Sequence, residues 1–180
     1  SGVYSNLVNT GIYILEPELL SFIPDNGMPD FGRDIFPALL KNKVPLYGYE
    51  MDDYWCDVGN PRAYLQAQED LLAGKVHADI APGIHPEAII GDHVHLQGHF
   101  FIGKGAVIEN GAIIRNAVIG DYSTVGKGAV IENSCLWKHT AVGAKARVQG
   151  SVLCDRAAVR GETVLEEGCV LGQGASVGAH

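Results

Sequence analysis

Aliphatic residues recur at nearly constant spacing through the second part of the chain. They follow one another every six positions, with three steps of five: Ile84, Ile90, Leu96, Ile102, Ile108, Ile114, Ile119, Val125, Ile131, Leu136, Val142, Val148, Leu153, Val159, Leu165, Leu171 and Val177. A small side chain mostly follows four residues later, as at Ala106, Ala112 and Ala129. This spacing predicts a three-sided coil in which each side is one short strand and each turn takes about 18 residues.

Stacking such coils would place every aliphatic side chain on one axis. The core is then continuous, although a single coil buries almost nothing. About five coils would stand roughly 25 Å tall, because neighbouring strands lie ~4.8 Å apart. The pattern stops in mid-coil at VGAH, residues 177–180. Since an open end exposes unpaired backbone groups, we expect the natural chain to continue or to pair at that end.

The first 80 or so residues follow a different pattern, with single helices and strands. LVNTGIYIL, 7–15, is rich in β-forming residues and predicts a buried strand. VPLYGYEMDDYWCDVG, 44–59, predicts two further strand runs. Between them we expect a short helix that starts near Pro17, and a second one in FGRDIFPALLKNK, 31–43, with Asp30 as its N-cap.

The best-marked helix follows Asn60. Asparagine is a strong N-cap residue, and Pro61 occupies the first helical position, where its missing N–H costs nothing. Gly74 is expected to end the helix. One of its faces is apolar and consists of Tyr64, Leu65, Leu71 and Leu72.

Composition excludes several classes of protein. The 180 residues are 47% hydrophobic, so the chain can bury a core, and the net charge of −8 argues against non-specific nucleic-acid binding. No apolar run approaches the ~18 residues that span a membrane, and the first residues lack a signal-peptide pattern. A cytoplasmic protein is therefore expected. The four cysteines form no C-x-x-C pair and are predicted to be buried, reduced thiols: Cys56, Cys135, Cys154 and Cys169.

Two sets of motifs resemble a known family. The hexads IGKGAV, 102–107, and VGKGAV, 125–130, are similar to the hexapeptide repeat of left-handed parallel β-helices. The handedness comes from this resemblance alone, since ordinary crossover rules favour the right-handed form. NTGIYILEPELL, 9–20, RDIFPALL, 33–40, and YWCDVGNPRAYLQAQEDLLAGKV, 54–76, occur in the order found late in the catalytic domain of sugar-phosphate nucleotidyltransferases. The combination looks most like mannose-1-phosphate guanylyltransferases.

The resemblance implies a fold class, namely an α/β remnant of a nucleotidyltransferase domain over 1–78 and an all-β left-handed parallel β-helix over 79–180. It also implies a reaction. A sugar 1-phosphate condenses with a nucleoside triphosphate, GTP being favoured, and pyrophosphate is released with Mg²⁺ neutralising charge. Asp57 matches the second metal-binding aspartate of the family, and Asn9, Thr10 and Gly11 match the stretch that lines the sugar pocket.

One large departure from the family limits these expectations. The glycine-rich nucleotide loop, the first metal aspartate and the Glu-Lys-Pro stretch of the family belong upstream and do not occur here. We therefore expect a fragment of a larger enzyme, inactive by itself and without bound metal. A homo-oligomer formed through the β-helix is also expected.

Simpler interpretations stand beside the functional ones. Asp57 precedes a Gly-Asn-Pro corner and, taken alone, would be a turn residue. His93, His95 and His99 are spaced like zinc ligands, but positions 93 and 99 fall on different sides of the coil, which favours surface roles. Trp137 would face outward, as a contact residue.

Two other functions remain open. A hexapeptide acyltransferase would need a projecting loop and a catalytic histidine, for which His139 is the residue to consider, but no insertion interrupts the repeat between 102 and 180. A non-catalytic oligomerisation or regulatory module is the third hypothesis. It would apply to this chain by itself, since a stacked coil presents long flat faces to another subunit.

Overall fold

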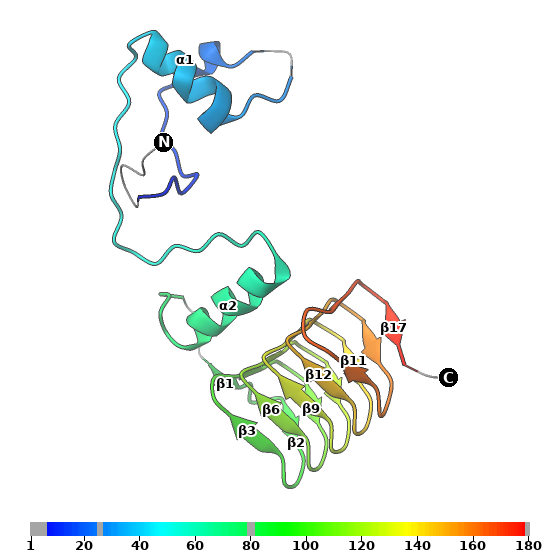
Figure 1. Ribbon diagram of the computed structural model, residues 1–180. Coiled ribbons are helices and arrows are strands. Elements are labelled where there is room, and N and C mark those ends of the chain that lie inside the picture. Colours follow the sequence, from blue (N-terminus) through cyan, green and yellow to red (C-terminus); the bar gives the residue numbers. More distant parts are fainter. Residues whose placement is uncertain (1–6, 25–26, 79–81, 179–180) are drawn as a thin grey trace. The chain divides into compact units, whose positions relative to one another are not determined.

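Hydrogen bonds between stacked coils organise the larger part of the computed structural model, which describes residues 7–24, 27–78 and 82–178 (Figure 1). The chain forms two compact units, one ending at Trp55 and the other beginning at Cys56. The division into domains 1–78 and 79–180 stays a prediction, and residues 79–81 lie outside the described part.

The β-helix has three faces, each a parallel sheet. Face 1 contains β1 (Gly83–Ile84), β4 (Phe101–Ile102), β7 (Val118–Ile119), β10 (Cys135–Leu136), β13 (Val152–Leu153) and β16 (Val170–Leu171). Face 2 contains β2 (Ile89–Ile90), β5 (Val107–Ile108), β8 (Thr124–Val125), β11 (Ala141–Val142), β14 (Ala158–Val159) and β17 (Ser176–Val177). Face 3 contains β3 (His95–Gln97), β6 (Ile113–Arg115), β9 (Val130–Glu132), β12 (Arg147–Gln149) and β15 (Val164–Leu165).

The predicted three-sided coil is confirmed, down to its register. Each strand pairs with the strand one coil away, so that Leu136 lies opposite Ile119 on one side and Leu153 on the other. These axial side chains are completely buried, whereas Ile84, in the first coil, is 46% exposed. Burial therefore follows from having a neighbouring coil on both sides. The left handedness of the β-helix stays a prediction.

The corners between faces explain the glycines and small residues of the repeat. Successive corners approach so closely that a Cβ added to Gly120 would lie 2.6 Å from the carbonyl carbon of Trp137. Side chains also hold the corners together: the Asp121 carboxylate accepts the backbone N–H of Lys104, at 2.9 Å, and the Asp155 carboxylate accepts that of Lys138, at 3.1 Å. Each coil is thus fixed to the next through its corners as well as its strands.

Residues 7–24 and 27–78 contain helices and extended or irregular segments, but no strands. The helices are the 3-10 helix η1 (Pro17–Phe22), the π-helical turn η2 (Phe31–Ile35), α1 (Phe36–Lys41) and α2 (Pro61–Leu72). Both predicted N-caps are confirmed, because Asp30 accepts the N–H of Arg33, at 2.8 Å, and Asn60 accepts that of Ala63, at 2.9 Å. Gly74, with φ +77°, follows the end of α2 as predicted.

The strands predicted at 7–15 and 44–59 do not form in the structure. A strand exists only where a neighbour pairs with its N–H and C=O groups, and neither segment has such a neighbour among the described residues. Their apolar side chains are correspondingly exposed, to 101% at Ile14 and 93% at Tyr47. These segments therefore have β-forming composition but no sheet to join.

The cysteines are free thiols, but their burial differs from the prediction. Only Cys135 is buried, and the other three are half-buried. Cys135 faces outward on β10, where α2 covers it, so its burial comes from the helix and not from the core of the coil.

Truncating an axial side chain should destabilise the β-helix strongly. We expect Leu153→Ala to lower the free energy of unfolding by ~2–5 kcal/mol, because the site is closed above and below and leaves a cavity. Val164→Ala, which shortens a side chain that is 55% exposed, should change it by less than about 0.5 kcal/mol. Urea unfolding followed by circular dichroism measures both. Equal losses in the two variants would contradict the axial-core description.

Candidate functional site

The segment Asn9–Gly11 forms a tight turn closed by its own asparagine. The Asn9 carboxamide oxygen accepts the N–H of Gly11, at 2.9 Å, and the Asn9 amide nitrogen donates to the hydroxyl of Tyr13, at 2.8 Å. Gly11 has φ +75°, a left-handed conformation that glycine adopts at little cost. The turn therefore fixes the orientation of the Asn9 carboxamide and leaves one of its two N–H groups without a described partner.

Aromatic packing holds this turn in place. The ring of Tyr13 lies 5.2 Å from that of Phe31 and 5.0 Å from that of Phe36, the second pair edge to face. These rings belong to η2 and α1, so the helices position the hydroxyl that Asn9 contacts. Asn9 and Gly11 are exposed and Thr10 is half-buried, so all three are accessible to a ligand. Tyr13 is the residue that the sequence motif did not identify.

Asp57 lies in the other compact unit, three residues before the N-cap of α2. Its carboxylate is exposed, and the neighbouring Gly59 presents no side chain to it. The predicted sugar-pocket turn thus lies in one compact unit and the predicted metal carboxylate in the other, each with its own local geometry.

The predicted metal site has a single carboxylate, that of Asp57, among the described residues. Among the described residues, no group of three or more His, Cys, Asp or Glu side chains could hold a metal ion. One exposed carboxylate suits Mg²⁺ that also binds substrate phosphates and water, and does not make a site by itself. His93, His95 and His99 are exposed, with His93 and His99 in different corners of the coil, and His139 stacks on Tyr122 with ring centroids 5.3 Å apart.

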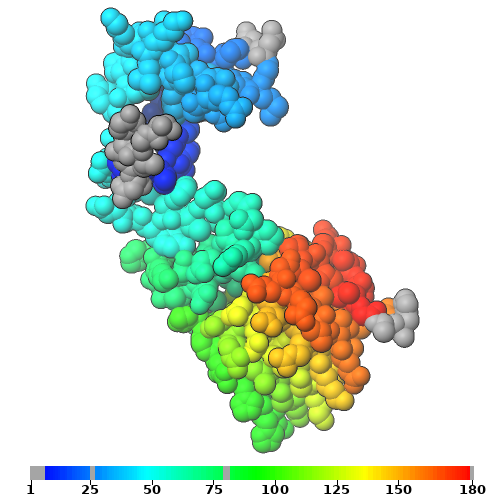
Figure 2. Space-filling view, in the orientation of Figure 1, coloured from blue at the N-terminus to red at the C-terminus, as the bar shows by residue number. Residues whose placement is uncertain are grey.

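Helix α2, which follows Asp57, packs on face 1 of the β-helix (Figure 2). The indole N–H of Trp137 donates to the hydroxyl of Tyr64, at 3.1 Å, and that hydroxyl lies 3.6 Å from the sulfur of Cys135. Burial raises the pKa of Tyr64 to about 12 and that of the Cys135 thiol to about 11. Both groups are uncharged at neutral pH, and the raised pKa values keep them uncharged further into the alkaline range.

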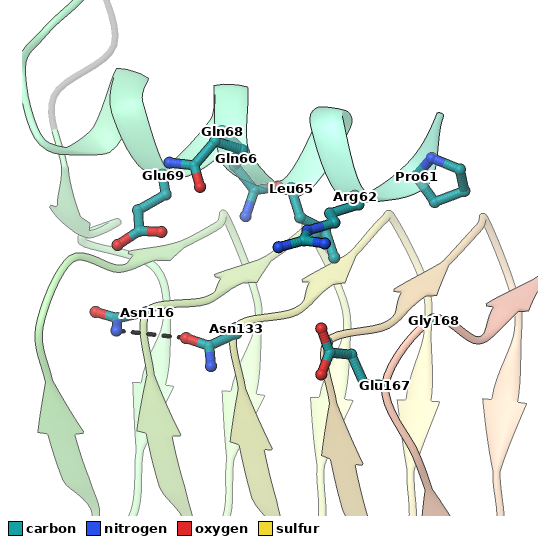
Figure 3. A pocket seen from close by; sticks show the side chains of 11 residues that line it. Pro61, Arg62, Leu65, Gln66, Gln68, Glu69, Asn116, Asn133, Glu167 and Gly168 are labelled. Atoms are coloured by element: carbon teal, nitrogen blue, oxygen red, sulfur yellow. Dashed lines mark hydrogen bonds between the residues drawn. The ribbon is translucent and has the colours of Figure 1, made fainter. Parts of the chain in front are cut away.

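A groove of about 480 Å³ lies along α2, between the helix and the corners that lead from face 3 to face 1 (Figure 3). The helix contributes Arg62 and Glu69, and the corners contribute Asn116, Asn133 and Glu167. Asn116 donates from its amide to the Asn133 carboxamide, at 3.4 Å. With two carboxylates against one guanidinium among its lining side chains, the groove does not favour a polyphosphate. Sequence reasoning missed it, because its walls come from segments far apart in the chain.

No helix in the described ranges is both long and apolar enough to cross a membrane.

Comparison with known proteins identifies both parts of the chain. Residues 82–180 match the family model described as EIF2B subunit epsilon LbH domain, and residues 2–74 match the model described as nucleotidyl transferase.

Three curated relatives illustrate the similarity. The chain is 33% identical to a UTP–glucose-1-phosphate uridylyltransferase from Synechocystis, in an alignment of 126 positions that covers 64% of this chain and 32% of that protein. It is 31% identical over 121 residues to a mannose-1-phosphate guanylyltransferase from Mycobacterium tuberculosis, covering 63% and 34%. It is 36% identical to a glucose-1-phosphate adenylyltransferase from Bacillus subtilis, in an alignment of 184 positions, gaps included, that covers 91% of this chain and 48% of that protein. The chain thus spans about one third to one half of these relatives.

Alkaline pH should loosen α2 from the β-helix. The folded pKa values of Cys135 and Tyr64 lie above the ordinary values of 9.0 and 10.0, so the contact is fully stabilised below about pH 9 and weakens as pH rises toward 12. In a Trp55→Phe background, Trp137 is the one tryptophan left, and its emission should shift to the red between pH 9 and 12. In Tyr64→Phe with Cys135→Ala, this transition should disappear. Its persistence there would assign it to other groups.

Proposed function

Because the chain belongs to the sugar-phosphate nucleotidyltransferases that carry a hexapeptide-repeat β-helix, we propose that its protein makes a nucleotide sugar. A phosphate oxygen of the sugar 1-phosphate attacks the α-phosphorus of a nucleoside triphosphate, the bond to the β-phosphate oxygen breaks, and pyrophosphate leaves. The observation that carries the proposal is the order of the two family matches along one chain, over 2–74 and then 82–180.

The described residues have separate tasks in this reaction. The exposed turn at Asn9–Gly11 offers an oriented amide N–H and a side-chain-free backbone, which suit the hydroxyl groups of a sugar. Asp57 supplies an accessible carboxylate at the end of an extended segment. When bound there with the phosphates, Mg²⁺ would neutralise the charge that develops as pyrophosphate leaves.

The exposed apolar residues of the first part support the idea that it works inside a larger domain. Leu7, Val8 and Ile12 are 62–68% exposed, and Tyr49 is 92% exposed. Exposed apolar side chains in such number suit a surface that packs against other parts of a protein. We propose that these β-forming segments join a sheet completed by the triphosphate-binding half of the enzyme.

The finer assignments are proposals of different strength. Mannose 1-phosphate and GTP are the first pair to test, because the sequence motifs resemble mannose-1-phosphate guanylyltransferases and two relatives bear that name. Relatives named for uridylyl and adenylyl transfer make UTP or ATP with glucose 1-phosphate the next pairs. A cytoplasmic homo-oligomer built through the β-helix remains part of the proposal. An acyltransferase is disfavoured, since no loop projects from the coil between residues 82 and 178.

The 180-residue chain by itself should release no pyrophosphate from any of these substrate pairs, because it supplies one metal carboxylate and no triphosphate-binding loop. Coupled pyrophosphate assays with Mg²⁺ measure this directly. Turnover by the purified chain would contradict the proposal that it is part of a larger active site.

In the intact enzyme, Asp57→Asn should lower kcat by about 100-fold, as expected when one group that stabilises developing charge is removed. Asp52→Asn, which changes an exposed carboxylate five residues earlier, is the matched control and should leave kcat unchanged. Equal activities of the two variants would refute the metal role of Asp57.

A further inference from the structure

Trp137 is unusual for its place in the coil. It directly follows the axial residue of face 1, where the preceding and following coils carry Gly120 and Cys154. Stacking requires no large side chain at those positions, because the backbones of successive corners lie very close together. The large side chain of Trp137 therefore does not serve the stacking of the coils. It reaches outward instead and is 41% exposed, with its N–H bonded to Tyr64.

The burial of face 1 shows where α2 lies. Cys135, Val152 and Val170 occupy the same outward position on three successive coils. The side chains of Cys135 and Val152 are only 3% and 5% exposed, whereas that of Val170 is 50% exposed. The helix thus covers β10 and β13, and leaves β16 open. Trp137 stands at the edge of this covered area and bonds to the residue that touches Cys135.

The contact is made in the first part of α2, close to the segment that carries Asp57. Tyr64 is the fourth residue of the helix, and its own N–H bonds to the carbonyl of Asn60, at 3.0 Å. Asn60 in turn caps the helix through Ala63. Only Val58 and Gly59 separate the cap from Asp57, so a fixed start of α2 keeps the Cα of Asp57 within about 11 Å of the Cα of Asn60.

We propose that Trp137 is a positioning residue for Asp57: it acts from the β-helix, through Tyr64, to fix the start of α2 and with it the carboxylate. The inference rests on the proposed function for the role of Asp57. On this proposal the β-helix contributes to the reaction by positioning Asp57, in addition to any role in forming an oligomer.

The contact can be tested first in the chain itself by hydrogen exchange. Trp137→Phe keeps an aromatic ring and removes the N–H donor, and Tyr64→Phe removes the acceptor. Either change should speed exchange of the Ala63 and Tyr64 amides about tenfold, the effect of losing one net hydrogen bond. Tyr122→Phe alters an exposed ring elsewhere on the same coil stack and is the control. Unchanged exchange in both contact variants would overturn the proposal.

The intact enzyme tests the effect on Asp57. Trp137→Phe should weaken Mn²⁺ binding about tenfold, measured by electron paramagnetic resonance with the nucleoside triphosphate present, as for other residues that orient a metal ligand. The value of kcat at fixed Mg²⁺ should fall, while KM for the sugar phosphate stays constant. Trp137→Phe combined with Tyr64→Phe should be no worse than either alone, because both remove one interaction.

The possible failures are distinguishable. An intact wild-type enzyme without turnover on any sugar 1-phosphate refutes the proposed function, and with it the assigned role of Asp57. Wild-type turnover with the same Mn²⁺ affinity in Trp137→Phe as in Tyr122→Phe refutes the positioning role alone. Loss of thermal stability in Trp137→Phe at unchanged Mn²⁺ affinity assigns Trp137 a purely structural contact, which also refutes it.

Discussion

The stacking of one coil on the next is the constraint on which the rest of the molecule depends. A single coil has no interior, so each axial aliphatic side chain is buried only by its counterparts above and below. The same stacking provides hydrogen-bond partners for the backbone N–H and C=O groups, since every strand pairs with a strand one coil away. Both requirements impose the same repeat, which is why the spacing of aliphatic residues is so strict while the outward positions vary freely.

That freedom makes the outer surface available for other uses. The residues that face outward on β10 and β13 contribute little to stacking, yet Cys135 and Val152 are buried because α2 lies over them. A rigid sheet is a good support for a short amphipathic helix, whose stability comes mostly from packing of one face. The helix that begins just after Asp57 therefore belongs structurally to the β-helix, although its sequence matches the nucleotidyl transferase model.

The features that the sequence predicted correctly depend on repeating or local contacts, and those that it missed depend on contacts between distant residues. The β-helix was predictable because its contacts repeat every 17 or 18 residues, and the caps Asp30 and Asn60 because capping is local. The strands at 7–15 and 44–59 were predicted wrongly, since β-forming composition does not supply a partner strand. The contact of Trp137 with Tyr64 joins residues 73 positions apart, and no periodic pattern in the sequence predicts it. For the candidate site, sequence motifs named Asn9 and Asp57 but could not show what orients them.

The dependence of α2 on one particular coil has a consequence for how the two sequence families are joined. If α2 were moved by one coil along face 1, Tyr64 would meet a corner with Gly120 or Cys154 in place of Trp137, and the hydrogen bond would be lost. The contact therefore fixes the register of the helix on the coil, in addition to holding it there. A β-helix of the same fold that lacked a donor at position 137 would therefore not fix the start of α2 through Tyr64. From Cys56 onward this chain is one compact unit, and we expect substitutions at position 137 to affect the Asp57 carboxylate before they affect the coil.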